Sequence, residues 1–390
     1  MIRQNIEIEN EDPDDPSGGG QTKGLLDPDA QEARSGDTPG YRISLYHWTT
    51  DGSIGESIAF ELKQLGHDVR SLLIHEPVDP DADIVFTYAP YGRWMHIPRQ
   101  LSRMPAERRP LLVHWNTEGL PPPNLPLLIQ SNLSILRSQF DESLQALTRT
   151  ALGALVGGLD GLFRYRMLRY RYVGDYLRTL RLGIPFLLVD ISALHTQRLE
   201  RMGVPCVNIP FGSSSRWHAD LNLERDIDVL WIGSHGSWRR TRQLNRIERA
   251  LAERNIRFHK VDGRSAPFVH GEERTTLINR SRIVLNLMRT PYDDNTLRHY
   301  IAMPNRALVV SEPMLRHNLQ LRPGVHYIEA PLAEIPEVIR YYLDHDDLRA
   351  ELVERAWRET TQELSMHHTV RQIICAASRR IRSGKTVDFA

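Results

Sequence analysis

The sequence predicts an α/β fold of two Rossmann-like domains that face each other across a cleft, and three observations support this. Short apolar runs typical of buried strands alternate with amphipathic segments typical of helices. The alternation occurs twice, first between residues 41 and 212 and again from residue 228. A chain of 390 residues is long enough to bury two cores. Such alternation is typical of βαβ units, whose parallel strands are joined by right-handed crossovers.

The two series contain similar elements. In the first, strand-like segments are expected at residues 41–48, 71–74, 84–87, 111–114, 186–189 and 207–212, with helices at 58–65 and 195–202. In the second, strands are expected at residues 228–233, 258–261, 283–287, 307–310 and 327–329, with helices at 242–253, 277–281, 335–343 and 348–364. The second series therefore repeats the architecture of the first.

The composition is that of a globular protein from a reducing compartment. Hydrophobic residues make up 41% of the chain and charged residues 25%. Basic and acidic residues balance at 49 each, so the net charge does not indicate a nucleic-acid partner. Cys206 and Cys375 are too far apart in sequence to indicate a disulfide framework or a metal site. Without an apolar run of transmembrane length or a signal-peptide pattern, the expected location is the cytoplasm.

The composition along the chain predicts the domain boundaries. Residues 1–39 are acidic, contain Gly18–Gly20 and lack apolar periodicity, which is typical of a disordered tail. Residues 213–226 are polar and irregular, as expected of a connection between domains. The expected organisation is a tail over 1–39, a first domain over 40–212, a linker over 213–226, a second domain over 227–375 and a C-terminal tail over 376–390.

A basic and aromatic segment interrupts the first series. Residues 164–172 combine four arginines with tyrosines, after an apolar and glycine-bearing stretch that begins near Leu144. Arginine and tyrosine suit the headgroup zone of a membrane, so one interpretation is a peripheral membrane contact. The alternative is a helix whose arginines are solvated and whose aromatic side chains pack on the domain, as is usual for such charge runs.

Two segments of the first domain are candidates for an acceptor-side site. The loop after the first strand contains glycines that allow a ligand to approach the backbone, although an ordinary βα turn has the same composition. Its candidate residues are Asp51, Gly52, Ser53 and Gly55. His114 and Glu118 come at the end of the strand over 111–114, where open sheets bind ligands, and either could act as a base on a hydroxyl. The alternative for His114 is a structural role.

The turn after the first strand of the second domain is a candidate phosphate cradle. Backbone N–H groups at a helix N-terminus bind phosphate, and arginines at the turn add bidentate contacts. A tight turn also needs glycine, so the motif alone is unspecific. The candidates are Gly233, Ser234, His235, Gly236, Arg239 and Arg240.

A helix–strand junction near residue 300 completes the candidate site. An amphipathic helical piece runs into the apolar strand Ala307–Val310, and Asp293, Asp294 and Asn295 precede it. Polar residues before such a junction are a plausible site rim, because ligands bind where strands and helices meet in loops.

The second domain resembles a known family. Residues 301–310, Ile-Ala-Met-Pro-Asn-Arg-Ala-Leu-Val-Val, are similar to the segment Glu-Ala-Met-Ala-Cys-Gly-Thr-Pro-Val-Val of two-domain nucleotide-sugar glycosyltransferases. An ordered set of motifs over residues 228 to about 375 resembles the C-terminal domain of the CgeB-like glycosyltransferases of spore maturation. The set comprises residues 228–234, Arg239 with Arg240, residues 278–286, Leu297 with Arg298, and residues 368–371. Residues 210–212 resemble the segment that precedes the linker in such enzymes.

The resemblance implies the GT-B fold and a glycosyltransferase activity. It implies that the second domain holds a UDP- or GDP-linked sugar and that the first domain holds the acceptor. Arg239 or Arg240 would contact the diphosphate, with Arg298 and residues 293–295 near the donor sugar. Arginines and a helix N-terminus that neutralise the phosphates make a metal ion unnecessary, and no cofactor is expected.

Two departures from the family pattern leave two functions open. Ile301 stands where related enzymes have the glutamate that binds the nucleotide ribose, and Arg306 replaces the glycine of that segment. Asp293, eight positions before Ile301, keeps a carboxylate on a shorter side chain. The first possibility is an active transferase in which another acid binds the ribose. The alternative is a catalytically degenerate GT-B module that serves binding or assembly.

Overall fold

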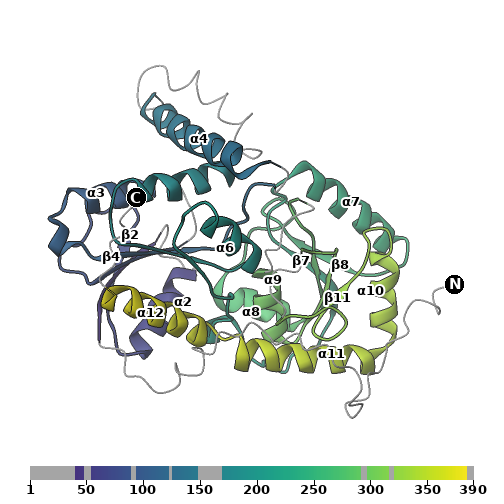
Figure 1. Ribbon diagram of the computed structural model, residues 1–390. Helices are drawn as coiled ribbons and strands as arrows, with labels where there is room; N and C mark the ends of the chain where they lie inside the picture. Colours follow the sequence, from purple (N-terminus) through teal and green to yellow (C-terminus); the bar gives the residue numbers. More distant parts are fainter. Residues whose placement is uncertain are drawn as a thin grey trace, which may run out of the picture. The chain divides into compact units, whose positions relative to one another are not determined.

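The computed structural model describes residues 40–47, 54–88, 94–122, 125–147, 169–290, 297–315 and 320–383 (Figure 1). All of them belong to one unit of the chain, Thr38–Ala390. Five predictions lie wholly or partly outside the described residues. They concern the tail over 1–39, the loop residues Asp51, Gly52 and Ser53, the basic segment over 164–168, the rim residues Asp293, Asp294 and Asn295, and residues 384–390 of the C-terminal tail.

The first domain is a parallel sheet with the strand order β2-β1-β3-β4-β5-β6. Its strands are β1 (Arg42–His47), β2 (Asp68–Leu73), β3 (Ile84–Tyr88), β4 (Leu111–Asn116), β5 (Phe186–Asp190) and β6 (Cys206–Asn208). Every residue of the central strands β3, β4 and β5 is buried, which explains why they appear as almost continuous apolar runs. The strand order reverses between β1 and β3.

The second domain is also a parallel sheet, with the order β11-β10-β9-β7-β8. Its strands are β7 (Ile227–Ile232), β8 (Phe258–Val261), β9 (Ser281–Asn286), β10 (Leu308–Ser311) and β11 (Ile328–Glu329). The order reverses between β7 and β9, and in open parallel sheets ligands bind outside the carboxyl ends of the strands at such a point. The predicted pair of Rossmann-like domains is therefore confirmed.

Helices connect the strands in both domains. The first domain has α2 (Ile54–Gln64), α3 (His96–Arg103), α4 (Leu127–Leu147), a helix over residues 169–180 and α6 (Ala193–Glu200). The second has α7 (Trp238–Ala252), α8 (Gly271–Asn279), α9 (Leu297–Ala302), α10 (Ile335–Asp344) and α11 (Asp346–Arg358), and the chain ends with α12 (Met366–Arg382). Single turns of 3₁₀-helix cover Ala106–Arg108, Ser215–Trp217 and Met303–Asn305, and Glu359–Glu363 is a π-helical turn. The hydroxyl groups of Ser192, Ser237 and Ser365 cap α6, α7 and α12.

Helix α12 returns from the second domain to the first. Its apolar residues Met366, Val370 and Ile373 share one buried cluster with Ile58 and Leu62 of α2, beside which α12 lies (Figure 1). The Thr369 hydroxyl donates a 3.0 Å hydrogen bond to the Pro210 carbonyl. The segment expected to be a tail from residue 376 therefore begins inside this helix, which continues to Arg382.

The linker over 213–226 is held firmly on the second domain by Asn305, a completely buried residue. The Asn305 side chain donates a 2.9 Å hydrogen bond to the Trp217 carbonyl and accepts one of 3.2 Å from the backbone N–H of Ala219. The same oxygen accepts a 2.9 Å bond from the Asn279 side chain. The backbone groups of this irregular segment thus form their hydrogen bonds with a side chain, where a strand would form them with a neighbouring strand.

Aromatic side chains fill the junction between the domains. The ring of Phe211 stacks on Trp115, with 5.1 Å between the ring centroids, and on Trp217 at 6.0 Å. Tyr300 of α9 packs edge-on against Phe211 at 5.2 Å. Because all four side chains are buried, this cluster joins the end of β4, the linker and α9 into one apolar contact.

The described part of the basic segment faces the protein interior. Tyr170 and Tyr172 are buried, and the Arg171 Nε atom lies 3.7 Å from the Asp141 carboxylate of α4. Arg169 lines the pocket between the domains. For residues 169–172 these contacts favour the second interpretation, a helix whose aromatic side chains pack on the domain. The arginines differ from that interpretation, because they contact protein groups and are not solvated. No helix in the described part of the chain is long and apolar enough to cross a membrane.

Candidate functional site

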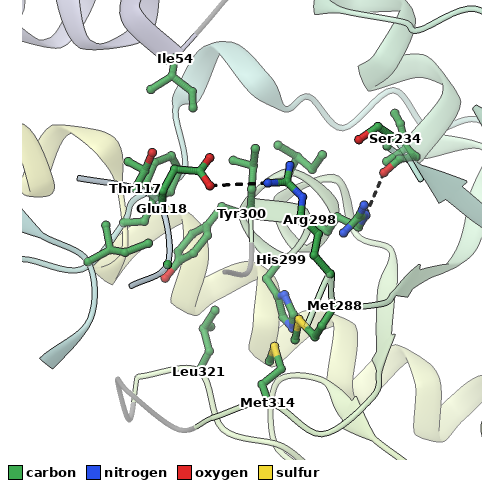
Figure 2. A pocket seen from close by; sticks show the side chains of 18 of the residues that line it. Ile54, Thr117, Glu118, Ser234, Met288, Arg298, His299, Tyr300, Met314 and Leu321 are labelled. Carbon is green, nitrogen blue, oxygen red and sulfur yellow. Dashed lines mark hydrogen bonds and ion pairs between the residues drawn. The ribbon is translucent and has the colours of Figure 1, made fainter. Parts of the chain in front are cut away.

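A pocket of about 360 Å³ lies between the two domains at the carboxyl ends of their strands. The first domain contributes Thr117, Glu118 and Gly119 after β4, and Ile191 after β5. The second domain contributes residues 232–234 after β7, residues 288–289 after β9, and residues 297–301 of α9. Figure 2 shows Thr117 and Glu118 on one side of the pocket and Ser234 on the other, with Arg298 between them. β7 and β9 flank the point where the strand order reverses, so the pocket lies where the topology predicts a ligand.

The pocket is strongly cationic. Its described lining contains one carboxylate, that of Glu118, and five arginines: Arg169, Arg240, Arg274, Arg289 and Arg298. Clefts lined by one sign of charge concentrate ligands of the opposite sign. The arrangement therefore suits an anion with several oxygen atoms, because guanidinium groups bind phosphates bidentately.

Arg298 of α9 occupies the centre of this charge. Its Nε atom donates a 2.8 Å hydrogen bond to the Ile232 carbonyl at the end of β7. One terminal nitrogen donates a 3.0 Å bond to the Asn286 side chain at the end of β9, and the guanidinium lies 4.1 Å from the centroid of the Trp231 ring. These contacts fix the guanidinium across the switch point of the sheet.

The protein holds Arg298 in a place that is unfavourable for a cation. Burial is the main reason why the pKa of Arg298 is well below its ordinary value, and the nearby guanidinium groups of Arg240 and Arg289 lower it further. Since arginine remains charged in proteins, the guanidinium is a buried cation beside two others, and a bound anion would offset both its loss of hydration and this repulsion.

The turn over residues 233–237 brings a helix N-terminus to the same place. Ser237 caps α7 by accepting a 3.2 Å hydrogen bond from the Arg240 N–H, and its hydroxyl donates a 2.9 Å bond to the Arg289 carbonyl. Gly233 has a φ of 136°, which L side chains rarely adopt, and a Cβ atom there would lie 2.4 Å from a terminal nitrogen of Arg298. Glycine at 233 is thus required by the close approach of Arg298 as well as by the backbone.

We expect Gly233→Ala to displace Arg298 and to weaken anion binding in the pocket. The added methyl group meets a guanidinium nitrogen at 2.4 Å and also strains the backbone, at a cost of about 1–3 kcal/mol for an unfavourable φ. Thermal unfolding and the dissociation constant for inorganic pyrophosphate would measure the two effects. Gly66→Ala is the matched control, because Gly66 also has a positive φ but open space at its Cβ. If both variants bind pyrophosphate equally, Arg298 does not contribute to the site.

The adjacent arginines at the start of α7 have different environments. Arg240 is buried, lines the pocket and donates a 3.1 Å hydrogen bond to the Ser234 carbonyl. Arg239 does not line the pocket. Its guanidinium forms an ion pair with the buried carboxylate of Glu312 and donates a 3.2 Å bond to the Met288 carbonyl. Consecutive helix residues point about 100° apart, so only one of the two faces the pocket.

His235 also points away from the pocket lining. Its ring nitrogens form hydrogen bonds of 3.0 Å with the Thr241 hydroxyl and 2.9 Å with the Asp262 carboxylate. Burial by itself raises the pKa of Asp262, but hydrogen bonds from His235 and from the backbone N–H groups of Ser265 and Arg264 outweigh it and hold the pKa below its ordinary value. His235 therefore anchors the turn to the end of β8.

Glu118 faces the pocket from the first domain. Its carboxylate lies 3.6 Å from a terminal nitrogen of Arg289, an ion pair that joins the two domains (Figure 2). The backbone of Glu118 is fixed by Asn116, which accepts a 3.2 Å bond from its N–H and donates a 2.9 Å bond to its carbonyl. Asn116 is held in turn by a 2.6 Å bond to Asp190 of β5. Asn116 and Asp190 were missed from the sequence, although both are polar residues that end buried strands.

His114 lies inside the first domain and does not line the pocket, which corrects its expected role as a base facing the acceptor. The side chain is completely buried and lies 2.7 Å from the Thr87 hydroxyl and 3.4 Å from the Tyr176 hydroxyl. Burial lowers the pKa of His114 to about 3. The reason is the position in β4: residues reach the pocket only after the strand ends, at Thr117.

The buried His114 predicts a stability that falls with acidification. Its pKa of about 3 lies below the ordinary 6.5, so the unfolded chain binds a proton that the folded chain does not. The resulting stability is fully present above about pH 6.5 and is lost as the pH falls toward 3, by up to about 1.4 kcal/mol per pH unit. Urea unfolding at pH 7 and pH 5 should show a smaller difference for His114→Gln than for the parent. If the stability difference between pH 7 and pH 5 is the same in the parent and in His114→Gln, His114 is not the group whose protonation destabilises the fold.

The segment around Ile301 lines the pocket from the second domain. Ile301 is buried, lines the pocket and belongs to the hydrophobic core, so no carboxylate is present at this position. His299, which sequence reasoning also missed, is completely buried and packs edge-on against Tyr327 with 4.7 Å between ring centroids. Gly55, the one described residue of the acceptor-side candidates, is not among the lining residues, whereas its neighbour Ile54 is.

Arg306 has a left-handed backbone conformation with a φ of 57°. This explains why a glycine suits the position in the resembling family, since glycine adopts such a φ without strain. Arg306 forms an ion pair with Glu354, and its guanidinium lies 4.2 Å from the Trp357 ring centroid. Contacts to α11 thus offset the strained backbone.

Comparisons with known proteins agree with this architecture. Residues 218–375 match the glycosyl transferase-like family. No curated protein matches the chain. The chain is similar to the structure of sucrose-phosphate synthase from Thermosynechococcus elongatus, with 12% identity, a TM-score of 0.53, and coverage of 88% of this chain and 100% of the other. It is also similar to HepE of Anabaena in complex with UDP-glucose, with 11% identity, a TM-score of 0.51 and the same coverage.

These likenesses establish the class of the fold. At such low identity they show the fold alone, and the fold is that of the GT-B glycosyltransferases, with two Rossmann-like parallel sheets and their helices. The expected fold class is therefore confirmed over the described residues. The family match lies over the second domain and the end of the linker, residues 218–375.

Proposed function

We propose that the chain is a glycosyltransferase that moves a sugar from a nucleoside diphosphate sugar to an acceptor. One observation carries the proposal: five arginines, one of them Arg240 in the first turn of α7, converge on a pocket at the switch point of the second domain, most of which matches a glycosyl transferase-like family. The HepE structure contains UDP-glucose, which makes UDP-linked sugars the first donors to test, before GDP-linked ones. The motif pattern suggests the CgeB-like enzymes as the subfamily.

On the donor side, the pocket would stabilise the departing diphosphate. Arg240, Arg298 and the backbone N–H of Ser234 would bind the oxygens on which negative charge develops. In many enzymes, fixed donors and charges in a site shielded from water contribute more to the rate acceleration than any other effect. Arginines would take the role that a metal ion has elsewhere, so we expect turnover to persist in the presence of EDTA.

On the acceptor side, Glu118 is the candidate base. It is the one carboxylate in the described lining, and its partner Arg289 belongs to the donor-binding domain. A diphosphate that attracts Arg289 would release the Glu118 carboxylate to accept the proton of an acceptor hydroxyl. The proposed location of this reaction is the cytoplasm.

Release of UDP or GDP from a panel of sugar donors tests the proposal. The full chain is expected to release UDP from a UDP-linked sugar, and Glu118→Gln should lower turnover while UDP still binds. UDP binding without turnover on any donor would favour the degenerate binding module, for which the buried Ile301 at the expected ribose position is the supporting observation. Absence of both binding and turnover would contradict both functions.

A further inference from the structure

Arg274 of α8 lines the pocket and has no ionic or hydrogen-bond partner in the part of the chain that the structure describes. Its Nε atom and one terminal nitrogen are buried and donate no hydrogen bond. The other arginines of the lining each donate to a protein group or pair with a carboxylate, and they are Arg169, Arg240, Arg289 and Arg298. Charged side chains are seldom buried without a partner. Arg274 is therefore a cation whose burial the protein itself does not offset.

Packing holds the Arg274 side chain in this place. The guanidinium lies 5.8 Å from the centroid of the Trp217 ring, which is buried and stacks on Phe211 at the junction of the domains. The next residue, Thr275, fixes α8 on the same segment by a 3.2 Å hydrogen bond from its hydroxyl to the Trp217 carbonyl. A cation–π contact at this distance is weak, and it leaves the hydrogen-bond donors of the guanidinium unused.

Arg274 is separate from the cationic centre of the pocket. Arg240 and Arg298 lie over the Trp231 ring of β7, 5.7 and 4.1 Å from its centroid. Arg274 lies beside a different tryptophan, that of the linker. The guanidinium groups of Arg240 and Arg289 contribute to the lowered pKa of Arg298. The pKa of Arg274 is also lowered, but burial is the cause, and no charge in the described part of the chain contributes. The pocket therefore contains two cationic places.

The charges of the pocket leave Arg274 without a counterion even when a donor is bound. The one carboxylate of the described lining, that of Glu118, already pairs with Arg289. A nucleoside diphosphate sugar carries one negative charge on each phosphate, and Arg240 and Arg298 lie at the proposed diphosphate position. Taking a cation out of water is costly unless an anion is supplied. The remaining charge of Arg274 thus indicates a further anionic group among the ligands.

We propose that Arg274 binds an oxyanion, a carboxylate or a phosphate group, that is not part of the donor diphosphate. The planar guanidinium offers either group two parallel hydrogen bonds, and the opposite charges strengthen both. In combination with the proposed function, and only then, this oxyanion belongs to the transferred sugar or to the acceptor. The transferase is then selective for a charged sugar or for a charged acceptor.

Thermal unfolding separates a ligand-binding role of Arg274 from a role in supporting the fold. Arg274→Met keeps an unbranched side chain beside Trp217 and removes a buried cation that has no partner. Its melting temperature in a chloride buffer should therefore equal or exceed that of the parent. Inorganic phosphate should raise the melting temperature of the parent more than that of the variant, because binding to the native state stabilises it.

Phosphorus NMR of inorganic phosphate measures the second site in the absence of any nucleotide. The starting protein is Arg298→Met, which lacks the charge at the centre of the pocket. Adding Arg274→Met should weaken phosphate binding at least about tenfold, the effect of one charge-assisted hydrogen bond. Adding Arg246→Met is the matched control and should leave binding unchanged, because Arg246 is an exposed arginine of α7 that does not line the pocket. Failure of the transferase assignment would leave this result unchanged.

Two nucleotide sugars distinguish the two sources of the oxyanion. If the sugar carries it, the parent should bind UDP-glucuronate at least about tenfold more tightly than UDP-glucose, and Arg274→Met should remove the difference. If the acceptor carries it, the two donors should bind equally. Inorganic phosphate should then still bind beside saturating UDP-glucose in the parent but not in Arg274→Met.

Three results would overturn the proposal. The first is equal phosphate binding by Arg298→Met with and without Arg274→Met. The second is a melting temperature of Arg274→Met that is several degrees below that of the parent in chloride, because the arginine would then support the fold. The third is equal weakening of UDP, UDP-glucose and UDP-glucuronate by Arg274→Met, which would place the guanidinium at the nucleoside diphosphate.

Discussion

Replacing Arg239 by alanine is expected to lower the free energy of unfolding by about 3–5 kcal/mol, the usual cost of leaving a buried charge without its partner. The charge left without its partner is the Glu312 carboxylate. Its side chain is 3% exposed and accepts hydrogen bonds from both terminal nitrogens of Arg239. The Glu312 carboxylate also accepts a 2.5 Å bond from the Met288 N–H. The pair thus connects α7 with the ends of β9 and β10. Urea unfolding at pH 7 measures the loss.

A second substitution distinguishes this stabilising role from a ligand contact. Adding Glu312→Gln to Arg239→Ala should restore much of the lost stability. A neutral amide still accepts the hydrogen bond from the Met288 N–H, and it leaves no unpaired charge in the interior. Affinity for UDP should change little in the double variant. If Arg239→Ala unfolds like the parent but no longer binds UDP, its guanidinium serves the pocket and the placement beside Glu312 is wrong.

Replacing Arg298 by methionine is expected to weaken UDP binding by about two orders of magnitude. Methionine keeps an unbranched side chain over Trp231 but removes the charge at the centre of the pocket. Each charge-assisted contact contributes about 1.5–3 kcal/mol, and a guanidinium offers a diphosphate two of them. Ligand-observed NMR at increasing protein concentration gives the dissociation constant of the variant and of the parent.

The control for Arg298 is the double variant Arg239→Ala with Glu312→Gln, which removes an arginine from the same domain outside the pocket. It should bind UDP as the parent does. Equal loss of affinity in the two variants would indicate a general effect of positive charge. Unchanged affinity in Arg298→Met would show that the diphosphate binds elsewhere.

The strands could be predicted from the sequence because a parallel sheet buried on both faces leaves an unmistakable pattern. β4 begins with Leu-Leu-Val and β9 contains Ile-Val-Leu, and their neighbours in the sheet follow the order of βαβ units. The return of α12 to the first domain could not be predicted, because its apolar face is equally suited to either domain. Its contact with α2 depends on packing between residues about 300 positions apart.

The candidate site was predicted in position but only partly in residues. Gly233, Ser234, Arg240, Arg298 and Glu118 come together because the carboxyl ends of the strands of both sheets meet at the pocket. The sequence does not show which of several neighbouring residues on one helix or strand faces the pocket, since this depends on the direction of each side chain. Arg239 and His114 both point elsewhere for this reason.

The family pattern around residue 306 shows what a sequence can and cannot indicate. The left-handed φ of Arg306 occurs where the resembling segment has glycine, so the alignment of this segment is physically sensible. The same alignment places Ile301, which lines the pocket, where the resembling enzymes are expected to have a carboxylate. Which acid binds a ribose in this chain therefore cannot be inferred from the motif.

Calorimetric titration of UDP into the full chain tests most directly whether the pocket binds a nucleoside diphosphate. We predict saturable binding at sub-millimolar UDP, with the affinity lost in Arg298→Met and retained in Arg239→Ala with Glu312→Gln. Binding to the native state should also raise the melting temperature as the UDP concentration increases. Absence of binding at millimolar UDP, or the same affinity in the parent and in Arg298→Met, would contradict the assignment of this pocket to a nucleoside diphosphate sugar.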